Sequence, residues 1–428
     1  MYRVPFDTGE LEFTLPSDWQ GTVVESKTAP PIDDVPAAVA AAVANPINSP
    51  PLREMARPKD KVCIVFTDIT RASPDYVLVP PILAELEAAS VRDEDITLLC
   101  GIGLHRPSTQ EEKVIKLGQA MVDRYRVIDN EPLNPEALVD LGITETGIPL
   151  SVHKTAYEAD LLIATGIVEP HQYAGYSGGR KTLAVGAAGE AMIAYTHGPQ
   201  MLDHPGTRLG RIEGNPFHKA VSEAARRAGL RFIVNVVQDD LKQVVYVRAG
   251  EPEAAFKELV AFAKTLYEVH VPQQYDVAVG GAGFPKDANL YQASRAASYL
   301  FFAPTPVVKP GGFLIVPAPC DEGAGEGVGE QRFLKAMQEA PDVQTILDDA
   351  RQHGYPPGQQ RAFVLAKVLE QAEVIIVGAE DPDLIRSAKF QVAPTMDAAF
   401  AMVRDSLGSN LEALVVPHAL LTLPIVQG

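Results

Sequence analysis

The sequence predicts an α/β protein of two domains, each with a mostly parallel sheet flanked by helices. Two observations predict this class: short, unbroken apolar runs of strand length recur along the chain, and segments with helical periodicity lie between them. The composition fits a globular chain, with 46% hydrophobic and 21% charged residues. A length of 428 residues is enough for two or three domains.

The strands are predicted from apolar runs that end at glycine-rich or polar loops. A run without polar alternation is typical of a strand buried on both faces, and such strands are usually parallel. The predicted strands are Val62–Phe66, Ile96–Cys100, Leu161–Ala164, Tyr275–Val279, Phe313–Val316 and Val374–Val377.

The clearest helix is predicted over Pro216–Ala228. Asn215 suits the N-cap, Pro216 suits the first helical position, and Gly229 suits the residue after the end. The apolar residues of this segment share one helical face. Because α/β sheets bind ligands beyond the carboxyl ends of their strands, we expect functional residues in the loops after the predicted strands.

A domain boundary is predicted at Val269–Gln274, where the helical segment Glu253–Tyr267 gives way to a new strand. We therefore expect an N-terminal domain over residues 1–268 and a C-terminal domain over residues 272–402. Motifs fall on both sides of this boundary, so we expect the active site in the cleft between the domains.

Composition disfavours several classes of protein. The chain has 37 basic and 55 acidic residues, and a net charge of −18 disfavours nucleic-acid binding. The three cysteines lie far apart, so a disulfide framework is not expected. No apolar run approaches the roughly 20 residues that span a bilayer, and the first ten residues lack a secretory pattern. We expect a cytoplasmic protein with no membrane partner.

Three histidines follow predicted strands within polar, glycine-rich sequence: His105, His171 and His197. A neutral imidazole serves as a general base or as a metal ligand near neutral pH. None of the three forms an HxxxH pair, so the spacing by itself defines no metal site. A single loop histidine is more often a solvated side chain. For three histidines on one sheet edge, a shared site is as good an interpretation as three solvated side chains.

The densest segment runs from His171 to Thr182 and contains Gly178, Gly179 and Lys181. It superficially resembles a P-loop, but Arg180 occupies the position of the second glycine. We therefore reject hydrolysis of a nucleoside triphosphate as the function. The glycines and the following helix start suit close approach to a ligand or a phosphate. Lys181 is either a surface or phosphate-binding charge or an amine used covalently, and the spacing does not decide between them.

Two arginines are candidates for binding a carboxylate, Arg71 and Arg295, because a guanidinium donates two parallel hydrogen bonds to it. A structural ion pair is the alternative for each. The glycine-rich segment Gly323–Gly329 lacks the context of a dinucleotide fingerprint, so no NAD motif is found, and the segment is interpreted as a mobile cover or a site of close approach.

Taken together, these segments resemble the nickel-dependent lactate racemase family of 2-hydroxyacid racemases and epimerases. The resemblance covers the whole chain. It depends on the order and spacing of Asp68-Ile69-Thr70-Arg71, Gly101-Ile102-Gly103-Leu104-His105-Arg106-Pro107, Glu169-Pro170-His171 with Ala174 to Lys181, His197, and Asn289-Leu290-Tyr291-Gln292.

The resemblance implies a nickel-pincer nucleotide, pyridinium-3-thioamide-5-thiocarboxylic acid mononucleotide, attached to Lys181, with His197 as a nickel ligand. It implies His105 and His171 as the acid/base pair. The further residues that it implies are Asp68, Thr70, Ser177, Gly178, Gly179 and Arg180 for the cofactor and Arg71, Gln292 and Arg295 for the substrate. It also implies that residues 403–428 return to the first domain, and that other proteins make the cofactor.

The expected activity is racemisation or epimerisation of a small 2-hydroxyacid by hydride transfer, through a planar 2-oxoacid that accepts the hydride back on either face. Two alternatives stay open: an NAD-type hydroxyacid dehydrogenase and a non-catalytic ligand-binding homologue. Some family members, the lactate enzymes among them, have lysine where this chain has Arg295, which leaves room for a larger or more polar substrate. Neither the substrate nor the oligomeric state follows from the sequence.

Overall fold

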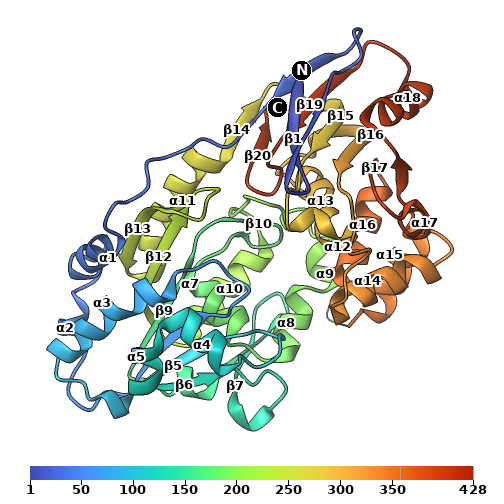
Figure 1. Ribbon diagram of the computed structural model, residues 1–428. Coiled ribbons are helices and arrows are strands. Elements are labelled where there is room, and N and C mark those ends of the chain that lie inside the picture. The colour runs from blue at the N-terminus through green and yellow to red at the C-terminus, as the bar shows by residue number, and fades with distance from the viewer. Residues whose placement is uncertain (357, 428) are drawn as a thin grey trace. The chain divides into compact units, whose positions relative to one another are not determined.

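The computed structural model describes residues 1–356 and 358–427 (Figure 1). Their internal contacts divide them into two compact units. The first, which we call the histidine unit, comprises Thr28–His197 and Ile212–Leu266. The second, which we call the terminal unit, comprises Met1–Lys27, Gly198–Arg211 and Tyr267–Gly428.

The histidine unit is built on a six-stranded sheet with the order β13-β12-β9-β4-β5-β6. All neighbouring pairs are parallel except the β12–β13 pair, which is antiparallel. The strands are β4 (Val62–Thr67), β5 (Ile96–Gly101), β6 (Arg126–Asp129), β9 (Leu161–Ile167), β12 (Leu230–Gln238) and β13 (Val244–Gly250). Two antiparallel pairs lie outside this sheet: β7 (Leu138–Ile143) with β8 (Pro149–His153), and β10 (Pro170–His171) with β11 (Gly175–Tyr176).

Helices and helical turns connect these strands. They are α1 (Val35–Ala44), α2 (Leu52–Met55), α3 (Asp75–Ala88), η1 (Asp93–Asp95), α4 (Gln110–Leu117), α5 (Gln119–Arg124), η2 (Pro135–Ala137), α6 (Lys154–Tyr157), α7 (Gly179–Lys181), the π-helical turn η3 (Thr182–Gly186), α8 (Glu190–Thr196), α10 (Pro216–Arg227) and α11 (Pro252–Tyr267). Apolar side chains of α1 and α3, such as Val39, Ile82 and Leu86, join Ile64 and Phe66 of β4 in one buried cluster. That burial explains why β4 shows no polar alternation.

The terminal unit has its own six-stranded sheet, with the order β18-β17-β16-β15-β19-β3 and parallel pairing throughout. Its strands are β3 (Gln20–Val23), β15 (Tyr275–Gly280), β16 (Val308–Pro317), β17 (Glu373–Val377), β18 (Gln391–Ala393) and β19 (Glu412–Val416). Two further pairs are β1 (Tyr2–Phe6) with β2 (Gly9–Phe13) and β14 (Glu268–Val271) with β20 (Leu423–Val426).

The helices of the terminal unit follow the same alternation. They are α9 (Pro199–Leu202), η4 (Lys286–Ala288), α12 (Leu290–Ala293), α13 (Arg295–Phe301), α14 (Val328–Glu339), α15 (Val343–His353), α16 (Gln360–Leu369), α17 (Pro382–Ser387) and α18 (Met396–Leu407). Phe400 and Val403 of α18 pack with Val277 of β15 and Val415 of β19 in a second buried cluster.

The predicted α/β class with mostly parallel sheets is confirmed, and each of the six predicted strands is present. The predicted helix over Pro216–Ala228 is confirmed as α10, whose N-cap Asn215 accepts hydrogen bonds from the backbone N–H groups of Phe217 and His218. Gly229 follows the helix with φ of +80°, a conformation that favours glycine.

The predicted domain boundaries differ from the units that the structure forms. Residues 1–27 and 198–211 group with the terminal unit, and so does the final segment, which was expected to return to the N-terminal domain. That expectation is wrong because β19 is an interior strand of the terminal unit, paired with β15 on one side and β3 on the other. Its apolar residues Ala413–Val416 are buried there.

Candidate functional site

The topology of the histidine unit brings the predicted loops to one sheet edge. The strands β9, β4 and β5 are neighbours and run parallel, so their carboxyl ends meet. Asp68 follows β4, His105 lies four residues after β5, and the segment from Glu169 to Lys181 follows β9. This edge is where an α/β sheet usually binds a ligand.

Asp68 and His105 form a pair at this edge. The Nδ1 atom of His105 lies 2.6 Å from Oδ2 of Asp68, and Thr70 donates a hydrogen bond of 2.7 Å to Oδ1. Burial by itself would raise the pKa of the Asp68 carboxyl, but the hydrogen bonds from His105 and Thr70 hold that pKa below its ordinary value. The carboxylate is buried while half of the His105 side chain is exposed, so Asp68 fixes an imidazole that stays accessible.

A buried ion pair holds the loop that carries Asp68. Lys116 of α4 lies 2.8 Å from the carboxylate of Asp75 and donates hydrogen bonds to the carbonyl groups of Arg71 and Ser73. The Asp75 carboxylate also accepts hydrogen bonds from Thr67 and Thr165. These groups fix the backbone of residues 71–73 from below the site.

Sequence reasoning missed this ion pair. Lys116 lies in an amphipathic helix where a lysine is ordinarily solvated, and Asp75 stands in the first turn of α3, where acidic residues are common. The sequence carries no signal that separates a buried lysine of this kind from a surface one.

Lys181 ends the short helix α7 and is followed directly by the π-helical turn η3. Such turns occur often at functional sites. A Cβ atom at Gly179 would lie 3.0 Å from Oδ1 of Asn235 and one at Gly178 would lie 3.1 Å from its Nδ2, so both glycines allow this turn to pack closely on β12. Burial, with the positive charge of Arg71 nearby, lowers the pKa of Lys181 to about 7. A large share of its amine is therefore neutral and nucleophilic at neutral pH.

His197 stands at the end of α8. Its Nδ1 atom lies 2.9 Å from the carbonyl oxygen of Ile193, and its ring packs edge-on against Tyr173 and Phe217. Burial and the charge of Lys181 lower the pKa of His197 to about 4, so the ring is neutral. Because a carbonyl oxygen only accepts, Nδ1 carries the proton and Nε2 has the lone pair, as in a metal-ligating histidine whose other nitrogen bonds to the backbone.

His171 lies in β10, and its ring is held by the turn that leads to β11. The backbone N–H groups of Tyr173 and Ala174 donate to its Nδ1 atom at 3.2 and 3.1 Å. The centroid of the His171 ring lies 5.7 Å from that of the Tyr173 ring. The Tyr173 ring in turn contacts His197. Tyr173 thus links the rings of His171 and His197.

Arg71 is exposed, and the residues that the structure describes offer its guanidinium no hydrogen bond or ion pair. Its charge lowers the pKa of both Lys181 and His197, and the charge of Asp68 also acts on Lys181. These interactions place the four groups in one electrostatic neighbourhood, which suits binding of an anion.

Two predicted cofactor residues have protein partners instead. Arg180 is buried, pairs with Glu253, donates to Ser222 at 2.8 Å and stacks on Phe256 at 3.9 Å. The hydroxyl of Ser177 donates to the Ile167 carbonyl at 2.7 Å and accepts from the Glu169 N–H group. These contacts give both residues structural partners, and their role in cofactor binding stays a prediction.

The remaining predicted substrate residues, Gln292 and Arg295, lie in the terminal unit. The Arg295 guanidinium donates to the Gln292 side chain at 3.2 Å and to the Tyr299 hydroxyl at 2.7 Å. Asn289 caps α12 by accepting from the backbone of Gln292. The structure therefore brings these two residues together, and their role in substrate binding stays a prediction.

The segment Gly323–Gly329 leads into α14 as a hydrogen-bonded turn. Glu330 accepts from the N–H group of Gly327 at 2.6 Å, and the carbonyl of Gly323 accepts from Leu290. Gly325 has φ of +98°, a conformation that favours glycine, and a Cβ atom there would lie 2.5 Å from the Glu330 side chain. Its expected role as a mobile cover is not supported by these contacts.

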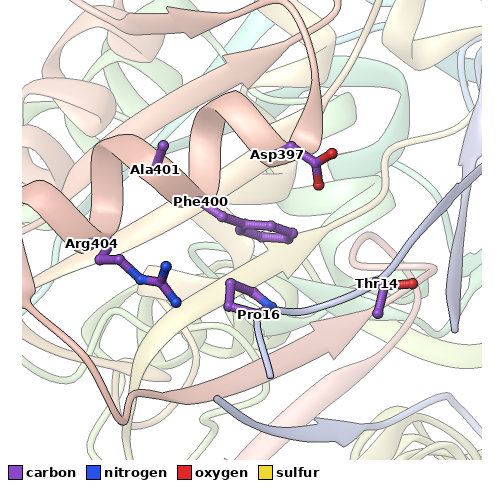
Figure 2. A pocket seen from close by; sticks show the side chains of 6 residues that line it. All are labelled: Thr14, Pro16, Asp397, Phe400, Ala401 and Arg404. Carbon is purple, nitrogen blue, oxygen red and sulfur yellow. The ribbon is translucent and has the colours of Figure 1, made fainter. Parts of the chain in front are cut away.

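Within residues 1–356 and 358–427, no group of three or more His, Cys, Asp or Glu side chains is arranged to hold a metal ion. No helix in the same residues is long and apolar enough to cross a membrane. A pocket of about 160 Å³ lies between α18 and residues 14–16, where Phe400 and Arg404 line one wall and Pro16 the other (Figure 2). It contains none of the predicted site residues.

Comparison with known proteins gives matches over most of the chain. The lactate racemase N-terminal domain matches residues 6–210, and the lactate racemase C-terminal domain matches residues 271–423. A lactate racemase of Lactiplantibacillus plantarum is 34% identical over 381 residues, which cover 88% of each chain. One of Thermoanaerobacterium thermosaccharolyticum is 29% identical over 421 residues, which cover 97% of each chain.

Solved structures show the same relationship. The lactate racemase apoprotein of Thermoanaerobacterium thermosaccharolyticum superposes with a TM-score of 0.87 at 28% identity and covers 99% of both chains. A protein of Thermotoga maritima superposes with a TM-score of 0.64 at 20% identity, covering 92% of this chain and 97% of that one, and shows the fold alone.

Proposed function

The chain belongs to the lactate racemase family, and we propose that it racemises or epimerises a small 2-hydroxyacid through a 2-oxoacid. The observation that carries this proposal is the grouping of His105, His171, Lys181 and His197 in the histidine unit, where hydrogen bonds hold the three histidines and burial lowers the pKa of Lys181. The curated relatives that match over most of the chain are named lactate racemases, which are isomerases.

The cofactor in this proposal is the nickel-pincer nucleotide, bound covalently through Lys181. The residues present fit such a group: Lys181 has a partly neutral amine that can form an amide-type bond, and His197 has an Nε2 lone pair in an apolar wall. When bound, the cofactor supplies a hydride acceptor for the Cα–H bond.

The protein's own residues would bind the substrate and move one proton. The exposed guanidinium of Arg71 would bind the carboxylate of the 2-hydroxyacid and so fix the direction of its Cα–H bond. His105 and His171 would serve the hydroxyl group as acid and base. Asp68 and Thr70, proposed from the sequence as cofactor residues, are already engaged with His105 and with each other, which supports a role in holding that histidine.

Substrate choice and cellular context complete the proposal. Arg295 with Gln292 would contribute to substrate selection. Partner proteins would make and load the cofactor. A cytoplasmic location agrees with three buried cysteines, Cys63, Cys100 and Cys320, that form no disulfide.

Two alternative functions make different predictions. An NAD-type hydroxyacid dehydrogenase would need a dinucleotide fingerprint, which the sequence lacks. A non-catalytic homologue would bind a 2-hydroxyacid without needing a lysine of low pKa beside a neutral histidine.

The test is whole-protein mass spectrometry, nickel analysis and a chiral assay on protein co-produced with cofactor-making enzymes. The expected result is a covalent adduct at Lys181, about one nickel per chain, and conversion of single-enantiomer 2-hydroxyacids to both forms. The Lys181→Ala variant should lack the adduct, while Lys154→Ala, at an exposed lysine, should keep it. NAD-dependent oxidation without adduct would support the dehydrogenase instead.

A further inference from the structure

The two loop histidines have different hydrogen-bond partners at the same ring atom. Nδ1 of His105 faces a carboxylate, whereas Nδ1 of His171 faces two backbone N–H groups. From this contrast we infer that the resting protein holds the two rings in opposite tautomers, so that His105 is the proton acceptor and His171 a hydrogen-bond donor. The role of these atoms toward a substrate rests on the proposed function, but the tautomers themselves do not.

The tautomer of His105 follows from the chemistry of its partner. An ionised carboxylate can only accept hydrogen bonds, so at 2.6 Å the Nδ1 atom of His105 must carry the proton. The second carboxylate oxygen of Asp68 is occupied by the Thr70 hydroxyl, which fixes the orientation of the carboxylate. Nε2 of His105 then has the lone pair, and the side chain is 53% exposed, so that lone pair is accessible. Asp68 is thus a positioning residue for His105.

The tautomer of His171 follows from the opposite argument. The N–H groups of Tyr173 and Ala174 can only donate, and both point at Nδ1. Nδ1 therefore has the lone pair, and the single proton of the neutral ring lies on Nε2. Protonating Nδ1 would break two hydrogen bonds at once.

Two other histidines in the same unit serve as internal references. His197 has Nδ1 against a carbonyl oxygen and so belongs to the class of His105. His153 has Nδ1 accepting from the N–H group of Thr155 at 3.2 Å and so belongs to the class of His171. Among the described residues of the histidine unit, each local geometry thus occurs twice.

The consequence concerns where the substrate proton goes. When the O–H bond of a 2-hydroxyacid breaks beside His105, the proton moves to Nε2, and the resulting imidazolium stays paired with Asp68. His171 offers an N–H group that stabilises negative charge on a substrate oxygen, but its Nε2 has no lone pair to accept a proton. For His171 to accept one, its proton must first move to Nδ1, which requires the turn at Tyr173–Ala174 to release the ring.

The test is a two-bond ¹H–¹⁵N correlation spectrum of the protein labelled with ¹⁵N-histidine, without cofactor or substrate, at about pH 8, where an unperturbed histidine is neutral. A protonated ring nitrogen and an unprotonated one resonate far apart, so each tautomer is read directly. His105→Gln and His171→Gln assign the two signals by their loss. We expect the proton of His105 on Nδ1 and that of His171 on Nε2.

A variant of the positioning residue sharpens the test. Asp68→Asn replaces an obligate acceptor with an amide that can also donate, so the Nδ1-protonated form of His105 should lose its dominance while the His171 signal stays unchanged. Asp123→Asn, at an exposed aspartate on α5, should leave both signals as they are. Thermal unfolding checks that each variant is folded, and the wild-type spectrum alone decides the main point.

The outcomes separate this inference from the proposed function. Equal tautomers in the two rings would overturn the inference and leave racemase activity untouched. An Asp68→Asn spectrum identical to the wild type would overturn the role of Asp68 as the positioning residue of His105. Opposite tautomers in a protein that takes up the cofactor yet racemises no 2-hydroxyacid would overturn the proposed function alone.

Discussion

The two six-stranded sheets of this chain have nearly the same architecture but very different loops. In the histidine unit, the loops after β4, β5 and β9 carry charged and imidazole side chains. In the terminal unit, the loops after β15, β16 and β17 begin with Gly281, Ala318 and Gly378. A Cβ atom at Gly281 would lie 2.1 Å from the Pro417 carbonyl and one at Gly378 would lie 3.0 Å from Phe6, so these two glycines allow close packing. Similar sheets thus carry different residues where their strands end.

The largest expected effect tests whether acid/base chemistry belongs to the histidine unit. His105→Gln removes the imidazole that Asp68 holds and should lower kcat/KM for racemisation by about 10²- to 10⁴-fold, the usual contribution of a general acid/base. The measurement is a chiral assay of cofactor-loaded enzyme, with nickel content determined on the same sample to show that loading is unchanged.

The terminal unit offers a matched control for that variant. His418 stands two residues after β19 and is exposed, so it occupies a strand-end loop as His105 does, and the described residues give its side chain no hydrogen bond. His418→Gln should leave kcat/KM within twofold of the wild type, as for an uncoupled surface residue. An equal loss of kcat/KM in both variants would show that acid/base chemistry is not confined to the histidine unit.

A second prediction compares the ion pairs of the two units. Lys116→Met leaves the carboxylate of Asp75 buried without its cation and should lower the free energy of unfolding by about 3–5 kcal/mol. Lys309→Met removes a pair of similar length from an exposed lysine in the terminal unit, and should cost about 0–1 kcal/mol. Urea unfolding followed by circular dichroism measures both. A small effect for Lys116 would mean that the loop below the site does not depend on this pair.

Much of this contrast is readable in the sequence, and the reason is local. The strands could be predicted because residues such as those of β4 and β9 are buried on both faces and therefore show no alternation. His105 and His171 could be singled out because parallel strands place their following loops at one edge, whereas Asp68 came from the family resemblance. Local patterns of this kind can be read from the sequence without any knowledge of tertiary structure.

What the sequence could not supply depends on long-range pairing. The Lys116–Asp75 pair joins residues 41 positions apart, and the place of β19 between β15 and β3 depends on both chain ends meeting in one sheet. The contact of Arg180 with Glu253, 73 residues away, is likewise invisible in the sequence around Arg180. Tertiary contacts of this type leave no periodic pattern.

The pKa of Lys181 gives a third prediction within the histidine unit. Because that pKa is lowered to about 7, the amine is protonated and unreactive below this pH and neutral above it, whereas an unshifted lysine stays protonated until about pH 10.4. Acylation of the cofactor-free protein by a small water-soluble ester, followed by peptide mass spectrometry, should show half-maximal rate at Lys181 near pH 7. A lysine in a short model peptide, acylated in the same way, should react at a rate that still rises above about pH 9. Parallel pH profiles for the two lysines would contradict the neutral amine at Lys181.

The smallest effect is expected from a substitution in the terminal unit. Arg295 lies in the terminal unit, and its guanidinium donates at once to Gln292 and Tyr299. A lysine keeps the charge but cannot reproduce both hydrogen bonds in the same plane, so Arg295→Lys should release the Gln292 side chain. If Arg295 selects the substrate, the ratio of kcat/KM between two 2-hydroxyacids, such as lactate and malate, should change by about tenfold, or about 1.4 kcal/mol, with nickel content unchanged. Single-enantiomer substrates from lactate to malate to sugar acids on cofactor-loaded enzyme measure this ratio. An unchanged ranking would show that Arg295 only braces α12 and α13, and that the terminal unit contributes no selectivity through it.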